Sequence, residues 1–157
     1  CKVDSDKALL RDVSGDIEWC KSNMMDSALV HKAKRDFAID VATLAKVMDS
    51  YESLKKDRNL LDFDDILMLM SAAIRTRPEI QSAVHSAYRW FTVDEFQDVN
   101  PLQKSVLDLW IGERDDICVV GDPSQTIYSF TGASSKYLTD FVKTYPNSTL
   151  VDLVRCY

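Results

Sequence analysis

Glycine and proline are scarce in this sequence, with four residues of each in 157, and positive charge is not in excess. The 25 acidic residues outnumber the 19 basic ones, so the formal net charge is −6 and no broad basic surface for nucleic acid is expected. Any contact with nucleic acid must therefore be local. The four cysteines stand far apart without a CxxC pair, and only two histidines accompany them, which argues against a structural zinc site.

Long apolar runs are missing as well. No stretch approaches the roughly 18–20 apolar residues of a membrane-spanning helix, and the start, CKVDSDK, lacks the apolar core of a signal peptide. Hydrophobic residues make up 46% and charged residues 28%, which is typical of a folded globular protein. We expect a reduced, cytoplasmic protein without a membrane partner. Because the chain does not begin with methionine, we also expect an internal piece of a longer polypeptide.

Residues 1–60 have the composition of helices, with one glycine, no proline and many alanine, lysine, aspartate and methionine residues. Apolar side chains recur at steps of three and four, which predicts one helix over about 27–58 with a single apolar face. The residues of that face are Phe37, Val41, Leu44, Met48 and Tyr51. The lysines of this region are expected on solvated faces, and they are Lys32, Lys34, Lys55 and Lys56.

Two local signals predict helices beyond residue 60, and after residue 90 the pattern changes. Asp62 is expected to cap a helix, and Pro78 to begin the next one. Short β-rich runs then alternate with helical stretches at about 101–111 and 134–144. These runs are WFTV (90–93), ICVVG (117–121) and STLVDLV (148–154). The alternation predicts an α/β fold with a parallel sheet.

The two sequence patterns predict two parts, a helical subdomain over 1–60 and half of an α/β core over 61–157. No flexible or low-complexity linker separates them. A junction of this kind favours insertion of the helical part into the core over two independent domains joined in series.

Polar residues directly follow two of the predicted strands. Asp94 and Glu95 follow the first, and Gln125 lies shortly after the second. Parallel strands end at the same edge of a sheet, where α/β proteins bind ligands, so these side chains are expected to converge. Asp94 is suited to hold Mg²⁺, Glu95 to orient and deprotonate a water, and the Gln125 amide to donate to a phosphate oxygen. The alternatives are an acidic surface cluster and an ordinary turn amide.

Two aromatic residues follow the second polar segment. Tyr128 and Phe130 lie two residues apart in a stretch that ends at Gly132. Aromatic rings in an exposed loop can stack on the bases of a single strand without a basic field. The alternative is that both rings belong to the core.

Two long segments carry a family resemblance. VDEFQDVNPLQ (93–103) and VVGDPSQTIYSFTGA (119–133) resemble motifs II and III of the UvrD/Rep/PcrA-like superfamily 1 DNA helicases, in the same order and spacing. LLDFDDIL (60–67) resembles the return from that family's inserted helical subdomain, 1B, to its core domain, 1A, and IEWCKS (17–22) resembles 1B itself. The resemblance implies part of a P-loop NTPase (RecA-like) parallel sheet with an inserted all-α subdomain.

The same resemblance implies an activity. Members of the family unwind DNA or translocate on it in the 3′–5′ direction, act on single-stranded DNA and DNA junctions, and use ATP and Mg²⁺ in repair or replication. Asp94 would hold Mg²⁺, Glu95 would be the catalytic carboxylate, and Gln125 would sense the γ-phosphate. All three would take part in binding the nucleotide.

The resemblance also assigns residues outside the immediate chemistry. Gln97 and Asp98 would be coupling and structural residues of motif II. Tyr128 and Phe130 would contact single-stranded DNA. The family usually has arginine where this chain has Thr131, so one basic contact is absent here.

No GxxxxGK[ST] loop occurs in the 157 residues, so the backbone nest and lysine that hold the β- and γ-phosphates are missing. We expect this loop, the motif IV arginine and a second RecA-like domain in the remainder of the same polypeptide, and we expect the chain alone to be inactive. Two alternatives stay open. One is a non-catalytic interaction module derived from such an enzyme, and the other is part of a RecB/AddA-like helicase-nuclease subunit.

Overall fold

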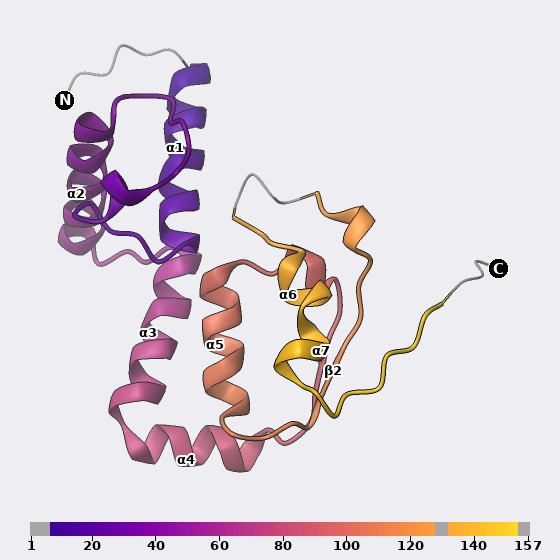
Figure 1. Cartoon of the computed structure of the whole chain (residues 1–157). Coiled ribbons are helices and arrows are strands. Elements are labelled where there is room, and N and C mark those ends of the chain that lie inside the picture. The colour runs from indigo at the N-terminus through magenta and orange to yellow at the C-terminus, as the bar shows by residue number, and fades with distance from the viewer. Residues whose placement is uncertain (1–6, 128–131, 154–157) are drawn as a thin grey trace.

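A computed structural model of the chain describes residues 7–127 and 132–153 (Figure 1). The longer helices are α1 (Lys7–Ser22), α2 (Val41–Arg58), α3 (Phe63–Thr76), α4 (Pro78–Ala87) and α5 (Pro101–Ile111). The strands are β1 (Phe91–Val93) and β2 (Ile117–Val119), and the short helices are α6 (Lys136–Thr139) and α7 (Phe141–Thr144). Single 3₁₀ turns are η1 (Val30–Lys32), η2 (Phe96–Asp98) and η3 (Pro123–Gln125).

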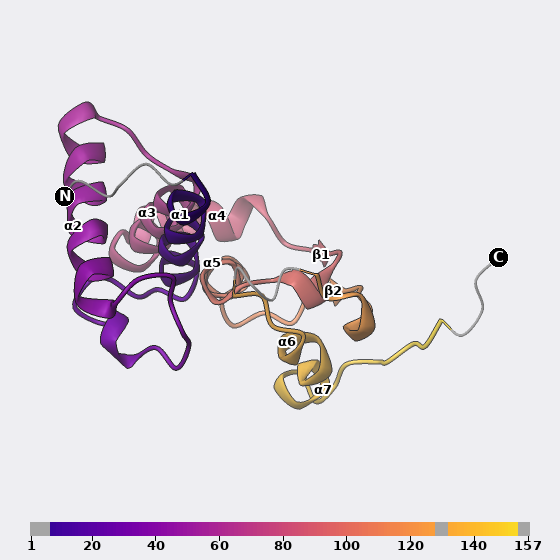
Figure 2. The same ribbon diagram turned by 90° about the horizontal axis from the view of Figure 1, so that it is seen from above.

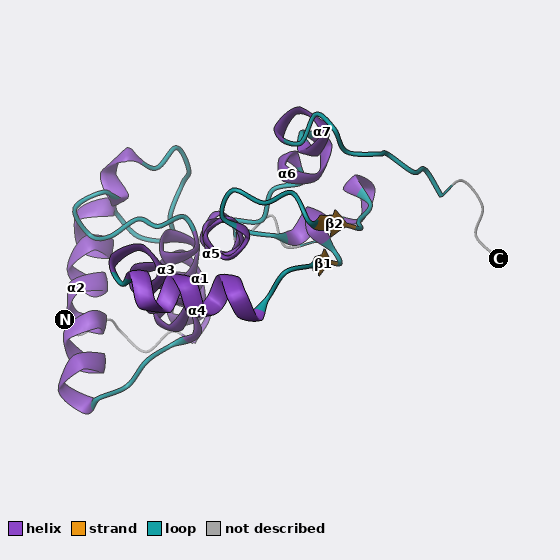
Figure 3. Cartoon of the chain, turned by 90° about the horizontal axis from the view of Figure 1, so that it is seen from below, coloured by secondary structure: helices purple, strands orange, loops and turns teal. Residues whose placement is uncertain are grey.

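The helices α3 and α5 connect two ends of the molecule. Helices α1 and α2 lie side by side at one end, and the two strands lie with α6 and α7 at the other (Figures 1 and 2). Helix α3 packs most extensively against α5 and also contacts α4 and α1. Figure 3 shows how little of the chain is strand. No helix in the described part of the chain is long and apolar enough to cross a bilayer.

The second helix begins later than the apolar periodicity predicts. The expected helix over 27–58 is wrong over 27–40, because η1 and a loop occupy that stretch and α2 starts at Val41. Asp40 fixes this start, since its side chain accepts a hydrogen bond from the Thr43 backbone at 2.9 Å. Phe37 nevertheless packs on the same core from the loop, with its ring centroid 6.0 Å from that of Trp19. The periodicity therefore identified Phe37, Leu44 and Met48 as core residues, whereas Val41 is exposed at the start of α2.

Helices α1 and α2 and the turn η1 enclose an apolar core. Its buried members are Val13, Cys20, Val30, Leu44 and Met48. Burial, with a smaller contribution from the nearby Asp16 carboxylate, raises the pKa of the Cys20 thiol to about 11, so Cys20 serves as a neutral core side chain. Asp16 is itself buried and accepts hydrogen bonds from Arg35 at 2.9 Å and from the Ala38 backbone at 2.7 Å. These bonds hold the α1–α2 connection against α1.

The predicted helix starts at Asp62 and Pro78 are confirmed. Asp62 and Asp65 form a reciprocal capping box at the start of α3, and Pro78 is the first residue of α4. A second capping box, between Asn100 and Gln103, begins α5. Each of these starts depends on residues within three positions of one another, which explains why sequence patterns locate them.

Two of the three predicted strands are present, and they form a parallel sheet. Phe91 pairs with Ile117 and Val93 with Val119, and α5 provides the crossover between the strands. The predicted third strand over 148–154 is wrong for its described part, since 148–153 contains no strand and its apolar side chains are exposed. A strand needs a neighbouring strand to satisfy its backbone groups. Within the described residues, this segment pairs with neither β1 nor β2.

The predicted helix over 134–144 is divided into α6 and α7, with Asp140 at the break. The described structure is therefore mostly helical with a small parallel sheet, so the α/β expectation holds only for the region around β1 and β2.

Candidate functional site

The carboxyl ends of β1 and β2 lie next to each other. Hydrogen bonds continue beyond the last paired residues, since the Val120 backbone donates to Val93 at 2.8 Å and the Phe96 backbone donates to Val120 at 2.9 Å. Phe96 is fully buried and anchors the turn that follows β1. The polar residues after both strands are therefore held at one edge of the sheet, as the sequence predicts.

Asp94 and Glu95 are both exposed at this edge. The Asp94 carboxylate accepts a hydrogen bond from the Glu95 backbone at 2.9 Å. Glu95 has φ 51°, in the left-handed region that a non-glycine residue rarely adopts. Such a conformation costs of the order of 1–3 kcal/mol, and residues that adopt it are found preferentially at functional sites. The two carboxylates offer the hard oxygen ligands that Mg²⁺ prefers.

Gln97 joins the two strand ends. Its side chain is fully buried, its Nε2 donates to the Glu95 carboxylate at 2.6 Å, and its Oε1 accepts from the Asp122 backbone at 3.1 Å. A Cβ on Gly121 would clash with the Gln97 side-chain oxygen. Glycine at this position therefore permits the close approach of the second strand end to Gln97.

Gln125 is connected to the same group through Asp122. The Asp122 carboxylate accepts from the Gln125 amide at 2.9 Å and from the Ser124 backbone at 2.9 Å. These hydrogen bonds hold the pKa of the Asp122 carboxyl below its usual range, so the group stays ionised. The result is a continuous chain of hydrogen bonds from Glu95 through Gln97 and Asp122 to Gln125.

Neither Asp122 nor Gly121 stands out in the sequence as a candidate site residue. The sequence does carry a signal for Asp122, because an aspartate in a turn often accepts a hydrogen bond from the backbone N–H two residues later, here that of Ser124. The contact between Gly121 and Gln97 had no local signal, since the two residues are distant in sequence and meet only across the sheet.

Asp98 and its neighbour Val99 tie the residues on both sides of 128–131 to the segment that follows β1. The Asp98 carboxylate accepts from the Ile127 backbone at 3.2 Å, and the Val99 carbonyl accepts from the Ser134 backbone at 3.3 Å. The predicted DNA contacts, Tyr128 and Phe130, lie outside the described residues, as does Thr131.

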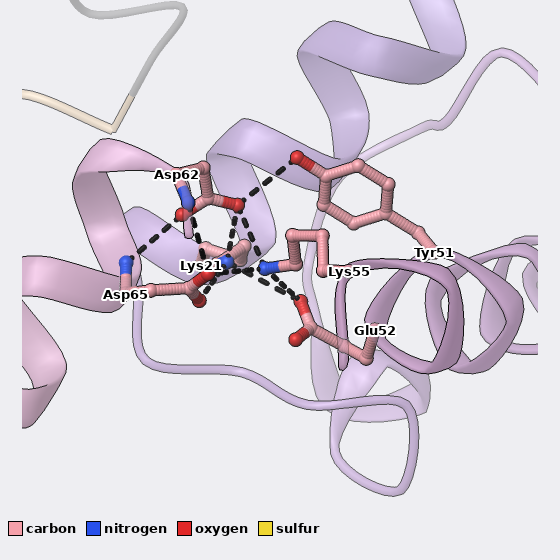
Figure 4. A network of polar contacts seen from close by, with 6 residues as sticks. All are labelled: Lys21, Tyr51, Glu52, Lys55, Asp62 and Asp65. Atoms are coloured by element: carbon pink, nitrogen blue, oxygen red, sulfur yellow. Dashed lines mark hydrogen bonds and ion pairs between the residues drawn. The ribbon is translucent and has the colours of Figure 1, made fainter. Parts of the chain in front are cut away.

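A second polar cluster lies where α1, α2 and α3 meet (Figure 4). Its members are Lys21, Tyr51, Glu52, Lys55, Asp62 and Asp65. The Lys55 ammonium lies 2.6 Å from Asp65, 2.9 Å from Asp62 and 2.9 Å from Glu52. The expectation of a solvated Lys55 is therefore wrong, since only 7% of this residue is exposed. A helical pattern places Lys55 on one turn with Glu52, but it does not reveal that Asp62 and Asp65, at the start of α3, also reach Lys55.

The α1 lysine completes this cluster. The Lys21 ammonium lies 2.6 Å from Asp62 and 2.5 Å from Asp65, and its side chain is 8% exposed. Glu52, Asp62 and Asp65 are close enough together to hold a metal ion. The two ammonium groups already lie between these carboxylates, so the cluster is explained as a network of ion pairs.

Electrostatics support this assignment. Burial alone would raise the pKa values of Asp62 and Asp65, but hydrogen bonds from Lys21 and Lys55 hold both below their usual range. Burial alone would lower the pKa of Lys55, whereas its bonds to the carboxylates raise it. All three groups therefore stay charged at neutral pH.

Comparison with known proteins places these segments in a family. The model of the UvrD/REP helicase N-terminal domain matches residues 2–146. The ATP-dependent DNA helicase UvrD2 of Mycobacterium tuberculosis (strain ATCC 25618 / H37Rv) is 45% identical over 155 residues, which cover 94% of this chain and 22% of the relative. The ATP-dependent DNA helicase PcrA of Leuconostoc citreum is 31% identical over 147 residues, or 94% of this chain and 19% of the relative.

The chain thus spans about a fifth of the length of these relatives. The matched residues include both strand ends and the polar cluster at the junction of α1, α2 and α3. The chain belongs to the UvrD/REP helicase N-terminal domain family.

Proposed function

We propose that this chain is part of an ATP-dependent 3′–5′ DNA helicase or translocase that acts on single-stranded DNA and DNA junctions in repair or replication. Membership of the UvrD/REP family supports this proposal, as do the two relatives, which are named ATP-dependent DNA helicases. ATP and Mg²⁺ would be the nucleotide and the metal ion.

The observation that carries the proposal is the hydrogen-bonded chain from Glu95 to Gln125 across the two strand ends. In the proposed mechanism Asp94 helps to hold Mg²⁺, which would offset the negative charge of the phosphates. Glu95 orients the attacking water and accepts its proton. The Gln125 amide donates to an oxygen of the γ-phosphate, and Asp122 fixes the direction of that amide.

Gln97 and Asp98 are proposed to couple the chemistry to the neighbouring segments. Gln97 touches both strand ends, so a shift of Glu95 alters the bond to Asp122. Asp98 holds the backbone of Ile127, immediately before Tyr128. We therefore assign these two residues to transmission rather than to the reaction itself.

The proposed contact with single-stranded DNA is stacking of Tyr128 and Phe130 on bases, which an acidic protein can provide without a basic field. The proposed division is a partial 1B-like helical subdomain over 1–60 and the second half of a 1A-like core over 61–157. It is supported by the separate apolar core of α1 and α2.

The proposed partners include the remainder of the same polypeptide, which would supply the phosphate loop and the second RecA-like domain. Exposed apolar side chains offer surface for such packing, among them Phe63 at 87% and Leu153 at 88% exposure. We propose a cytoplasmic location for the whole protein.

The proposal is tested in the full-length protein by Glu95→Gln and Asp94→Ala. Glu95→Gln should reduce ATP turnover by about 100-fold or more and leave nucleotide affinity nearly unchanged, because it removes a group that acts on water. Asp94→Ala should also weaken binding of the Mg²⁺-nucleotide complex. Turnover is measured by phosphate release with single-stranded DNA present, and affinity by calorimetry with a non-hydrolysable analogue.

Glu113→Gln is the matched control, since this exposed glutamate lies beyond α5 and takes no part in the strand-end chain. Its turnover should equal that of the wild type. Small and equal effects of Glu95→Gln and Asp94→Ala would contradict the assignment of the site.

A further inference from the structure

The backbone of Gly132 packs directly against the side chain of Asn23, the residue that follows α1. Gly132 has φ +96°, and a Cβ built on it would lie 2.5 Å from Nδ2 of Asn23 and 3.4 Å from its Cγ. A Cβ does not approach another heavy atom this closely without displacing it, and an L side chain rarely adopts this φ. Glycine at 132 thus allows the chain that leaves motif III to touch the end of α1.

Asn23 is fixed relative to α1. Its side-chain Nδ2 donates to the Trp19 carbonyl at 2.8 Å, and its backbone N–H donates to the same carbonyl at 3.1 Å. The next turn closes the helix, because the Met25 backbone donates to Cys20 at 2.8 Å. Lys21, two residues before Asn23, belongs to the ion-pair network with α2 and α3. A movement of Asn23 therefore requires a movement of α1.

The segment around Gly132 is fixed to motif II. The Ser134 backbone donates to the Val99 carbonyl at 3.3 Å, and Ala133, which lies between Gly132 and Ser134, is buried. Residues 132–134 therefore touch both the end of motif II and the end of α1.

We propose that Asn23 is a positioning residue, and that its contact with Gly132 links the helical N-terminal region to the nucleotide site. This inference rests on the proposed function. When a nucleotide shifts Glu95 and the turn that follows it, the shift reaches residues 132–134 through the Val99–Ser134 hydrogen bond, and the contact transmits it to α1. Because such coupling is reciprocal, DNA that shifts the helical N-terminal region also acts on the nucleotide site through this contact.

The experiment uses the full-length protein with Asn23→Ala, Gly132→Ala and the double variant. Basal and DNA-stimulated ATP hydrolysis are measured for each, together with its melting temperature. Gly112→Ala is the matched control, because Gly112 also has a positive φ of +65° and its added Cβ would lie 2.8 Å from His85. That contact joins α4 to the end of α5, and neither residue belongs to the hydrogen-bonded chain from Glu95 to Gln125.

Asn23→Ala and Gly132→Ala should each lower the DNA-stimulated rate about fivefold, with the basal rate within about twofold of the wild type. The double variant should lose no more than the stronger single variant, because both changes break one contact. Gly112→Ala should lower the melting temperature without changing the ratio of the two rates. If Asn23→Ala melts below the assay temperature, Asn23→Ser replaces it, since a serine hydroxyl can also donate to the Trp19 carbonyl.

An Asn23→Ala protein with the stimulation ratio of the wild type would overturn the inference, and so would additive losses in the double variant. A wild-type protein without DNA-stimulated hydrolysis would overturn the proposed function itself. The two failures are therefore distinguishable.

Discussion

At the scale of single residues, the site depends on an amide that carries no charge. Gln97 is fully buried, and it donates to one strand end and accepts from the other. A glutamate or an aliphatic residue here could satisfy only one of these two partners or neither. The left-handed backbone of Glu95 is a second residue-scale feature, because the turn it creates brings consecutive carboxylates to the edge of the sheet.

Gln125→Ala in the full-length protein should reduce DNA-stimulated hydrolysis more than basal hydrolysis, by about fivefold in the ratio of the two rates. The reason is that Gln125 is hydrogen-bonded to Asp122 and lies three residues before Tyr128, so it links the proposed γ-phosphate contact to the proposed DNA contact. Phosphate release with and without single-stranded DNA measures both rates. Gln81→Ala, at an exposed glutamine of α4, serves as the control. Equal loss of both rates would instead indicate a purely local role in the reaction.

At the scale of elements, the junction of α1, α2 and α3 is set by charge rather than by apolar contact. Two lysines with 8% exposed side chains lie between three carboxylates that come from α2 and from the start of α3. The Tyr51 hydroxyl also donates to Asp62 at 3.0 Å, and the Lys55 ammonium lies 4.7 Å from the centre of the Tyr51 ring. Asp62 and Asp65, which cap α3, thus also orient that helix against α1 and α2.

Lys55→Met should lower the free energy of unfolding at pH 7 by about 1.5–3 kcal/mol, because it leaves partly buried carboxylates short of a charged donor. The depressed pKa values of Asp62 and Asp65 contribute stability above their unfolded values near 3.9 and lose it as the pH falls further. The raised pKa of Lys55 contributes stability that persists below its unfolded value near 10.4. The difference between wild type and variant should therefore be constant from about pH 5 to 10 and shrink below about pH 4.

Urea unfolding at a series of pH values measures this difference. Lys56→Met is the matched control, since this neighbouring lysine is exposed and its loss should change the free energy of unfolding by no more than about 0.5 kcal/mol. Equal effects of the two substitutions would show that the network adds nothing to stability.

At the scale of the whole molecule, the chain offers one half of the nucleotide site proposed above. The strand ends offer carboxylates and an amide, whereas the sequence has no glycine-rich phosphate loop and no lysine in such a loop. Most of the attraction for the phosphates of a nucleotide comes from such a loop and its lysine. The acidic balance of the chain adds a repulsive background for polyphosphates.

The 157-residue chain by itself should therefore bind Mg²⁺-ATP only weakly, with a dissociation constant above about 1 mM, which corresponds to a binding free energy weaker than about −4.1 kcal/mol. Isothermal titration calorimetry with the chain and Mg²⁺-ATP tests this expectation. Micromolar affinity would mean that other residues of the chain cradle the phosphates.

The sequence alone determined the features that depend on neighbouring residues. The capping box at Asp62, the proline start of α4, the helix α5 and the strands β1 and β2 follow from side chains within a few positions. The position of Asp94, Glu95 and Gln125 at one sheet edge also follows, because parallel strands end on the same side.

Only the tertiary structure decided the remaining features. Phe37 packs on the core from a loop, and Lys55 is buried because its ammonium meets Asp62 and Asp65 at the start of α3. Residues 148–153 form no strand, and they pair with neither β1 nor β2. The contacts of Gln97 with Asp122 and of Gly132 with Asn23 join positions 25 or more residues apart. Sequence patterns report local backbone preference and periodic burial. They do not report which distant surface supplies the partner, and in this protein such partners fix the geometry of the site.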